Sequence, residues 1–448
     1  MALNKKLSLI GVMGIGLTTV IGSGIWRDSL LWPNSAGILS LVTVSIGWLL
    51  FMCAGLAYAE CVSMFPKGGG PYSYVGGAFG DKTGSYAGLL YLFGYFFIGT
   101  VLCFLTALFT LAAFDTNTFS FLTPGYLALF TSVYLVIFII LAGLSSPKVL
   151  GLATFSWVAI KIILVIVVFI IALTNWQSVN INNLTGGGFQ VGINSSLWAL
   201  MGFEVMLVFA GNTKDVEKTM PKAILIVLPI ILVLYLFVAF VGSSIISIGE
   251  IPADAGTIGV MMTLVAKTGI PATAIFIFAA FSAAGTAYAM LATCFQQSRV
   301  LAEDKVLPEI FQKKIKGIDL WNILLAIAIT IPVGLIMTLT SNDWDYSVDF
   351  FANAGVALIL ISALLPAGIS ALYLRIKLPA LNRPFKTPIY FIVFPLAVLL
   401  SLYLLVLNFL DIANLWPALV LFIAICLITL ALVFLIPKER KEEETVEP

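Results

Sequence analysis

The stretch Ile21-Gly22-Ser23-Gly24-Ile25 interrupts a hydrophobic segment that runs from about residue 7 to residue 32. Glycine weakens a helix, and two glycines that flank a serine favour an unwound stretch. A second hydrophobic segment, from about residue 196 to residue 212, is interrupted at Met201-Gly202-Phe203-Glu204. Unwound backbone is tolerated at membrane depth only where it lines a cavity or is buried in protein. Paired interruptions in two halves of a chain therefore predict a binding site between the halves.

The composition places the whole chain in a membrane. Of its 448 residues, 61% are hydrophobic and 10% are charged, and the mean hydropathy is +1.09. These values are typical of an all-α polytopic membrane protein and exclude a soluble domain. Apolar runs of spanning length predict about 12 transmembrane helices. They lie near residues 7–32, 37–60, 86–113, 126–143, 151–173, 193–213, 222–246, 271–298, 320–339, 347–375, 386–408 and 412–436.

The distribution of positive charge predicts the orientation. If the N-terminus is cytoplasmic, the inner loops and tails carry 20 of the 23 Lys and Arg residues. The outer loops carry only Lys267, while Arg27 and Lys161 lie within hydrophobic segments. A bias this strong follows the positive-inside rule. We therefore expect a multi-pass protein of the cytoplasmic (cell) membrane with both termini in the cytoplasm.

The spans divide into two halves within one transmembrane domain, residues 1–448. The first repeat covers 7–173 and the second covers 193–375, and each opens with an interrupted helix. Five spans per half is an odd number, so the halves have opposite topology and form a five-plus-five inverted repeat with discontinuous helices 1 and 6. Residues 386–436 add two further helices, and residues 437–448 form a cytoplasmic tail.

Several function classes are excluded by what the chain lacks. Without histidine there is no His-based catalysis, metal ligation or proton relay. The five cysteines form no Cys-x-x-Cys pair, which argues against a zinc site and a disulfide framework. We therefore expect that the protein is not an enzyme and that it binds no cofactor, metal or nucleic acid. A channel would need a continuous polar lining and a sensor would need a soluble output domain, so both are less favoured.

The two interruptions have opposite polarity. The N–H groups of Ser23, Gly24 and Ile25 would open a second half-helix, whose positive end suits a carboxylate, and the Ser23 hydroxyl adds a donor. The alternative is a glycine face that packs against a neighbouring helix. At the second interruption, free carbonyls near Trp198, Ala199 and Met201 could accept hydrogen bonds from an ammonium group. Trp198 could instead belong to an interfacial aromatic belt.

Four charged residues inside hydrophobic segments are candidates for function: Lys161, Glu204, Arg27 and Asp28. Lys161 is at mid-span, where a lysine is costly unless it is paired, neutral or hydrated, and burial favours the neutral amine that a proton carrier needs. Snorkelling to an interface is the alternative. Glu204 follows the second interruption and could hold its loose backbone by accepting N–H bonds. We favour an interpretation in which Arg27 and Asp28 line an outer vestibule and pair with each other or with outer acids. The alternative is a gate or a charge that steers the substrate.

These residues resemble the amino acid–polyamine–organocation transporter superfamily over nearly the whole chain. The resemblance rests on Ile21 to Ile25, on Pro66 to Gly80, on Gly202-Phe203-Glu204 followed by Lys214 to Ile224, and on Ser298 to Pro308.

The resemblance implies an L-amino acid bound at mid-membrane. The α-carboxylate would bind Gly22, Ser23 and Gly24, with Ile25 beside them, and the α-amino group would bind Ala199, Met201 and Gly202. Trp198 would cover the substrate, Tyr95 and Gly99 would line the site from the third span, and Met290 would do so from the eighth. Lys161 falls where proton-coupled relatives carry a lysine in place of sodium, with Thr286 or Ser282 as its neighbour.

Three features depart from the family pattern. Trp26-Arg27 follows the first interruption, where the family usually has Phe and no cation. Met290 stands where arginine exchangers have a tryptophan, and the implied site lacks an evident acid for a cationic side chain. The combined prediction is a secondary active transporter of L-amino acids, coupled to protons through Lys161, that works as a monomer or homodimer in the lipid bilayer. An amino acid/amine antiporter of the same fold is the alternative.

Overall fold

The structure, a computed structural model, describes residues 6–176, 187–252, 254–315, 317–339, 344–409 and 412–435. Almost all of them are helical, and the β pairing within these ranges consists of two isolated bridges, Leu7 with Thr213 and Ile315 with Ile318. The predicted tail, residues 437–448, lies outside the described ranges. The all-α prediction is therefore confirmed.

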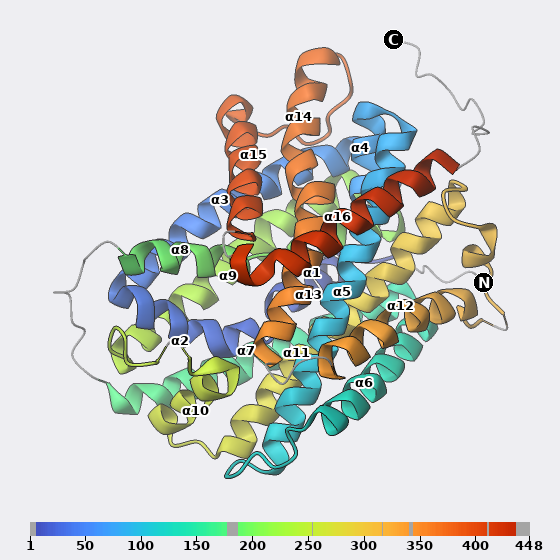
Figure 1. Ribbon diagram of the computed structural model, residues 1–448. Coiled ribbons are helices and arrows are strands. Elements are labelled where there is room, and N and C mark those ends of the chain that lie inside the picture. The colour runs from blue at the N-terminus through green and yellow to red at the C-terminus, as the bar shows by residue number, and fades with distance from the viewer. Residues whose placement is uncertain are drawn as a thin grey trace.

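Figure 1 shows these helices packed against one another. The first half contains α1 (Leu9–Val20), α2 (Gly24–Ala36), η1 (Gly37–Leu39), α3 (Ser40–Met64), α4 (Pro71–Phe79), α5 (Asp81–Phe114), α6 (Pro124–Leu144), α7 (Pro147–Ala172) and η2 (Leu173–Asn175). The remainder contains α8 (Gly187–Ala199), η3 (Phe203–Asn212), α9 (Val216–Ile245), α10 (Gly256–Thr268), α11 (Ala272–Glu303), η4 (Glu309–Gln312), α12 (Leu320–Leu339), α13 (Trp344–Ile359), η5 (Leu360–Leu364), α14 (Leu365–Lys377), α15 (Tyr390–Leu407) and α16 (Ile412–Leu435).

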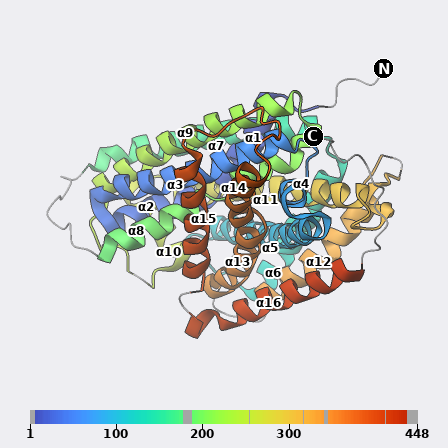
Figure 2. The same ribbon diagram turned by 90° about the horizontal axis from the view of Figure 1, so that it is seen from above.

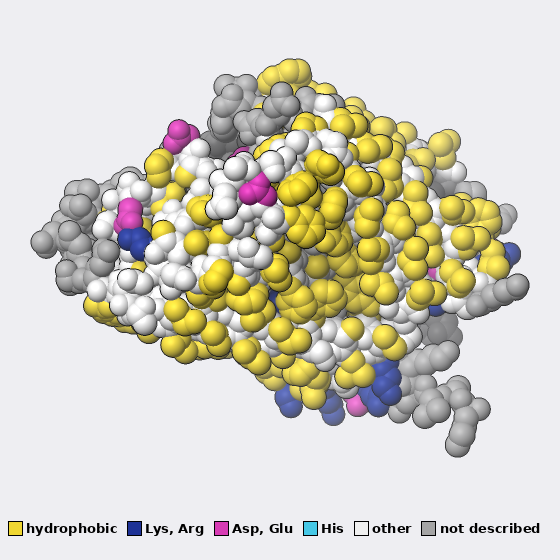
Figure 3. All heavy atoms as spheres, turned by 90° about the horizontal axis from the view of Figure 1, so that it is seen from below, with side chains coloured by type: hydrophobic (Ala, Val, Ile, Leu, Met, Phe, Trp, Pro, Cys, Tyr) yellow, Lys and Arg dark blue, Asp and Glu magenta, His cyan; other side chains and the backbone are white. Residues whose placement is uncertain are grey.

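Ten helical segments of the described chain are long and apolar enough to cross a membrane, and two shorter apolar helices, α1 and η3, accompany them. Their outward side chains are apolar over a broad surface (Figure 3), as a lipid-facing exterior requires. The polytopic membrane fold is thus confirmed, while the number of 12 spans stays a prediction. The sequence reading missed α10, which is short and lies between two spans.

Two groups of helices surround the interrupted segments. In one group α3 packs on α9 and on α8, and α2 packs on α8; in the other, α5 packs on α11 and α6 packs on α12. The first interrupted helix lies between them, because α1 contacts η3 and α9 on one side and α7 and α11 on the other. In Figure 2, α16 lies at the outer edge of the bundle, where it contacts α13 and α5.

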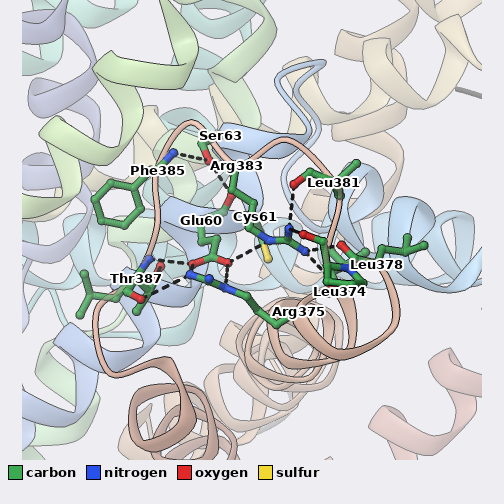
Figure 4. A network of polar contacts seen from close by, with 12 residues as sticks. Glu60, Cys61, Ser63, Leu374, Arg375, Leu378, Leu381, Arg383, Phe385 and Thr387 are labelled. Atoms are coloured by element: carbon green, nitrogen blue, oxygen red, sulfur yellow. Dashed lines mark hydrogen bonds and ion pairs between the residues drawn. The ribbon is translucent and has the colours of Figure 1, made fainter. Parts of the chain in front are cut away.

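A buried ion network fixes the end of α3 to the connection between α14 and α15 (Figure 4). Glu60 is fully buried, and its Oε1 and Oε2 accept hydrogen bonds from Nε and Nη2 of Arg375 at 2.6 and 2.8 Å. Oε2 also accepts from the Thr387 N–H at 2.8 Å, and Arg383 Nε lies 3.6 Å from Oε1. Arg383 in turn donates to the Leu374 carbonyl near the end of α14. The network therefore joins α3 to α14 and to the connection that follows α14, more than 300 residues further along the sequence.

Candidate functional site

The first interruption separates α1 from α2 at residues 21–23. The Ile21 N–H still bonds the Leu17 carbonyl at 2.9 Å, and the Gly22 N–H bonds the Val20 carbonyl. Within the described chain, no backbone carbonyl accepts from the N–H groups of Ser23, Gly24 or Ile25. A helix start of this kind presents free donors and the positive end of the helix dipole. It could accept a carboxylate.

Lys161 of α7 lies directly behind this interruption and is fully buried. Its Nζ lies 2.9 Å from the Ile21 carbonyl, 3.0 Å from Thr286 Oγ1, and 3.1 and 3.2 Å from Oγ1 and O of Thr18. The Thr286 hydroxyl donates to the Thr18 carbonyl at 2.7 Å. The ammonium group is thus surrounded by oxygen dipoles of α1 and α11, and no described acid forms an ion pair with it.

Ser282 lies near Lys161 but does not form a hydrogen bond with it. Its Oγ donates to the Gly22 carbonyl at 2.7 Å, one turn along α11 from Thr286. A side chain at Gly22 would lie 3.2 Å from Thr286 Oγ1, so the glycine permits this close approach. Three elements, α1, α7 and α11, therefore meet through polar contacts at the first interruption.

The second interruption covers residues 200–202, between α8 and η3. Gly202 has φ of 113°, a region that side chains avoid, and a Cβ there would lie 2.9 Å from the Thr19 carbonyl oxygen. Glu204, almost fully buried, spans the turn: Oε2 accepts from the Gly202 N–H at 3.0 Å, and Oε1 accepts from the Tyr95 hydroxyl at 2.7 Å. The segment that follows is a ten-residue 3-10 helix, much longer than most.

Two residues that the sequence reading missed join the two interruptions. The Thr19 hydroxyl lies 2.8 Å from the Gly202 carbonyl. The Tyr235 hydroxyl of α9 lies 3.2 Å from the Val20 carbonyl and 2.9 Å from the Ala199 carbonyl, so the carbonyl ends of α1 and α8 converge on one point. A tyrosine at the middle of an apolar span was the available signal, because Tyr is normally found at the membrane interfaces.

One face of α2 remains accessible beside the site. Gly24, Arg27, Asp28, Leu31 and Asn34 are half-buried at helical spacing, whereas the intervening side chains are buried. A Cβ added at Gly24 would lie 3.0 Å from Oδ2 of Asp28. Ion pairing of Arg27 with a described acid is not seen, and its Nε has no hydrogen-bond partner there. The outer vestibule and the gate that the sequence suggests for Arg27 therefore stay predictions, whereas the expected ion pair of Arg27 is absent from the described residues.

The other predicted residues lie around the same region. Ala199 and Met201 are half-buried at the second interruption, Ser23 and Ile25 are buried at the first, and Met290 is buried in α11. Gly99 of α5 packs against Leu291 of α11. A Cβ added at Gly99 would lie 3.0 Å from Cδ2 of Leu291, so the glycine permits close packing of the two helices. Trp198 falls in α8, and its side chain lies outside the described part of the structure.

Comparison with known proteins identifies the kind of chain that carries this site. A family model described as amino acid permease matches residues 7–444. The serine/threonine exchanger SteT of Bacillus subtilis is 24% identical over 403 residues, which is 87% of this chain and 87% of that protein. The inner membrane transport protein YbaT of Escherichia coli is 25% identical over 345 residues, covering 73% and 76%. The mouse b(0,+)-type amino acid transporter 1 is 23% identical over 318 residues, covering 67% and 62%.

The fold also resembles a solved structure. A crystal structure of a mutant manganese transporter from Eremococcus coleocola superposes with a TM-score of 0.61 over 95% of this chain and 93% of that one, at 14% identity. At this identity the likeness concerns the fold alone.

Proposed function

The chain belongs to the amino acid permease family, and from this membership we propose that it is a secondary active transporter of L-amino acids. It would work by alternating access in the cytoplasmic membrane, with protons coupled to the substrate through Lys161. Both termini would lie in the cytoplasm, as the distribution of lysine and arginine favours.

The observation that carries the proposal is the opposite polarity of two interruptions that lie next to each other. Free N–H groups at Ser23, Gly24 and Ile25 provide a pole for a carboxylate, and the carbonyls of Val20 and Ala199 provide a pole for an ammonium. The Tyr235 hydroxyl contacts both carbonyls and can donate only one proton, so acceptor capacity remains for an amino group. An α-amino acid carries these two charges on one carbon.

The surroundings of Lys161 support the proposed coupling to protons. The ammonium group donates to carbonyl and hydroxyl oxygens of α1 and α11. Deprotonation of Lys161 would remove one N–H donor. The hydrogen bonds that connect the first interruption to α7 and α11 would then be weaker. Deprotonation toward the cytoplasm would thereby loosen the substrate's carboxylate pole and favour release.

Alternating access would move one helix group against the other. The contacts of α3 with α9, α5 with α11, and α6 with α12 join the second, third and fourth spans of one proposed repeat to their counterparts in the other. This pairing supports repeats at 7–173 and 193–375, with 386–436 outside them. The spans of α1, α3, η3 and α9 would rock against those of α5, α6, α11 and α12.

Exchange of one amino acid for another is the second candidate. It is favoured by the relation to a serine/threonine exchanger. The same two-pole site would serve an exchanger, which differs in that the empty carrier does not reorient.

Uptake by proteoliposomes would separate these possibilities. We expect the purified protein to accumulate at least one L-amino acid from a panel when the lumen is alkaline, without sodium and without a preloaded substrate. Uptake that occurs only against a preloaded amino acid or amine would favour the exchanger. Strict sodium dependence would refute proton coupling, and no transport of any member of the panel in either format would refute the amino acid substrate.

A further inference from the structure

A cavity of about 190 Å³ lies at the ends of α1 and α7, beside the connection from η3 to α9, and away from the two interruptions. Three of its lining residues are lysines and none is acidic. The lining consists of Lys6, Leu7, Ser8, Gly11, Lys148, Leu152 and Lys214.

The three lysines come from distant parts of the sequence and are held together by the backbone. The Leu7 N–H donates to the Asn212 carbonyl at 2.7 Å, and the Lys214 N–H donates to the Leu7 carbonyl at 3.1 Å. On the other side, α1 and α7 approach so closely that a Cβ on Gly151 would lie 2.8 Å from the Gly11 Cα. These contacts fix the backbone positions of the three lysines relative to one another.

The cavity is a site of uncompensated positive charge. Lys6, Lys148 and Lys214 are exposed and form no ion pair within the described chain. Asp215 and Glu217 follow Lys214 but do not line the cavity. The N-termini of α1 and α7, capped by Ser8 and Ser146, add the positive ends of two helix dipoles. An anion is the ligand that this arrangement favours.

The surroundings of the cavity are apolar as well as basic. Leu152 lines it and is 52% exposed, and the neighbouring Ile10 and Val149 are 50% and 56% exposed. Figure 3 shows Lys and Arg side chains gathered along one edge of the molecule, directly beside the broad apolar surface. A free anion gains nothing from exposed aliphatic side chains, whereas a lipid places its acyl chains against them and its headgroup among the lysines.

We propose that this cavity binds the phosphate headgroup of an anionic phospholipid. The phosphate lies between Lys6, Lys148 and Lys214, and the acyl chains lie along Ile10, Val149 and Leu152. The bound lipid links the start of α1 to α7 and to the connection before α9, and thereby stabilises the protein against unfolding. The site is independent of the substrate and of its coupling to protons.

Thermal unfolding of the full chain in neutral detergent tests the proposal, with native mass spectrometry to count retained lipid. The probes are phosphatidylglycerol, phosphatidylcholine and inorganic phosphate. The test variant is Lys6→Gln/Lys148→Gln/Lys214→Gln. The matched control, Lys218→Gln/Lys222→Gln/Lys313→Gln, removes the same charge from exposed lysines outside the cavity. A Lys→Arg triple at the three cavity positions keeps the charge.

Phosphatidylglycerol should raise the unfolding midpoint of the wild type, the control and the arginine triple, while the other probes should not. The cavity variant should bind it roughly 100-fold more weakly, because each lysine near an anionic surface contributes about fivefold. Comparing shifts rather than absolute midpoints keeps the test valid if the variant starts less stable. An equal loss in the control would show diffuse attraction and overturn the site. An equal shift with inorganic phosphate would overturn the lipid as ligand, and no shift in the wild type would overturn the proposal.

Discussion

Replacing Lys161 should abolish the accumulation of substrate that a pH gradient drives. With one proton carried per zwitterionic amino acid and the membrane potential clamped at zero, each pH unit supplies about 1.4 kcal/mol, or roughly tenfold accumulation. We expect this tenfold ratio in the wild type and a ratio of about one in Lys161→Ala. The reason is that Lys161 is the titratable group in contact with both α1 and α11 at the first interruption.

The side chain is fully buried, so the variant also needs a control for folding. Lys161→Met keeps the aliphatic volume and removes the charge, and it should retain substrate counterflow between equal pools while losing the response to pH. Lys222→Met, at an exposed position of α9, should behave like the wild type. Full pH-driven accumulation in Lys161→Ala or Lys161→Met would contradict the coupling role.

The second large effect concerns stability. Glu60→Gln should lower the free energy of unfolding by about 3–5 kcal/mol, because it leaves the buried Arg383 and the half-buried Arg375 without their carboxylate. The midpoint of thermal unfolding in detergent should fall by roughly 5 °C or more. Glu309→Gln, at an exposed position on the connection after α11, is the matched control and should change the midpoint little.

A double-mutant cycle distinguishes this network from a general sensitivity of the region. Arg375→Gln should cost much less in the Glu60→Gln background than in the wild type, because the two residues lose one shared bidentate contact. Costs that simply add, or a Glu60→Gln midpoint equal to that of the Glu309→Gln control, would show that the network contributes little.

The sequence predicted where the two helices are interrupted. It did not predict which side chains form hydrogen bonds with the backbone at the interruptions. Glycines at 22, 24 and 202 weaken helices wherever they occur, and Lys161 stands out in an aliphatic span, so local chemistry sufficed for these. The partners Thr18, Thr19 and Tyr235 come from packing between helices, on which hydropathy carries no information. All-apolar spans show no polar face from which an orientation could be read.

The ion network around Glu60 could not be predicted from the sequence either. In the sequence, Arg375 and Arg383 belong to the positive charges of the inner loops, and nothing marks Glu60 as their partner. The structure buries the acid and brings both guanidinium groups to it across 315 and 323 residues of sequence. Long-range pairing of this kind requires the fold to be known.

The central claim is that proton and amino acid cross together, and proton movement measures it most directly. Wild-type proteoliposomes with a pH-sensitive dye in the lumen are held at equal internal and external pH, with the membrane potential clamped at zero and without sodium. Adding a transported amino acid outside should acidify the lumen at about one proton per amino acid taken up, and Lys161→Met vesicles should take it up without acidification. Uptake by the wild type with no acidification would contradict the account.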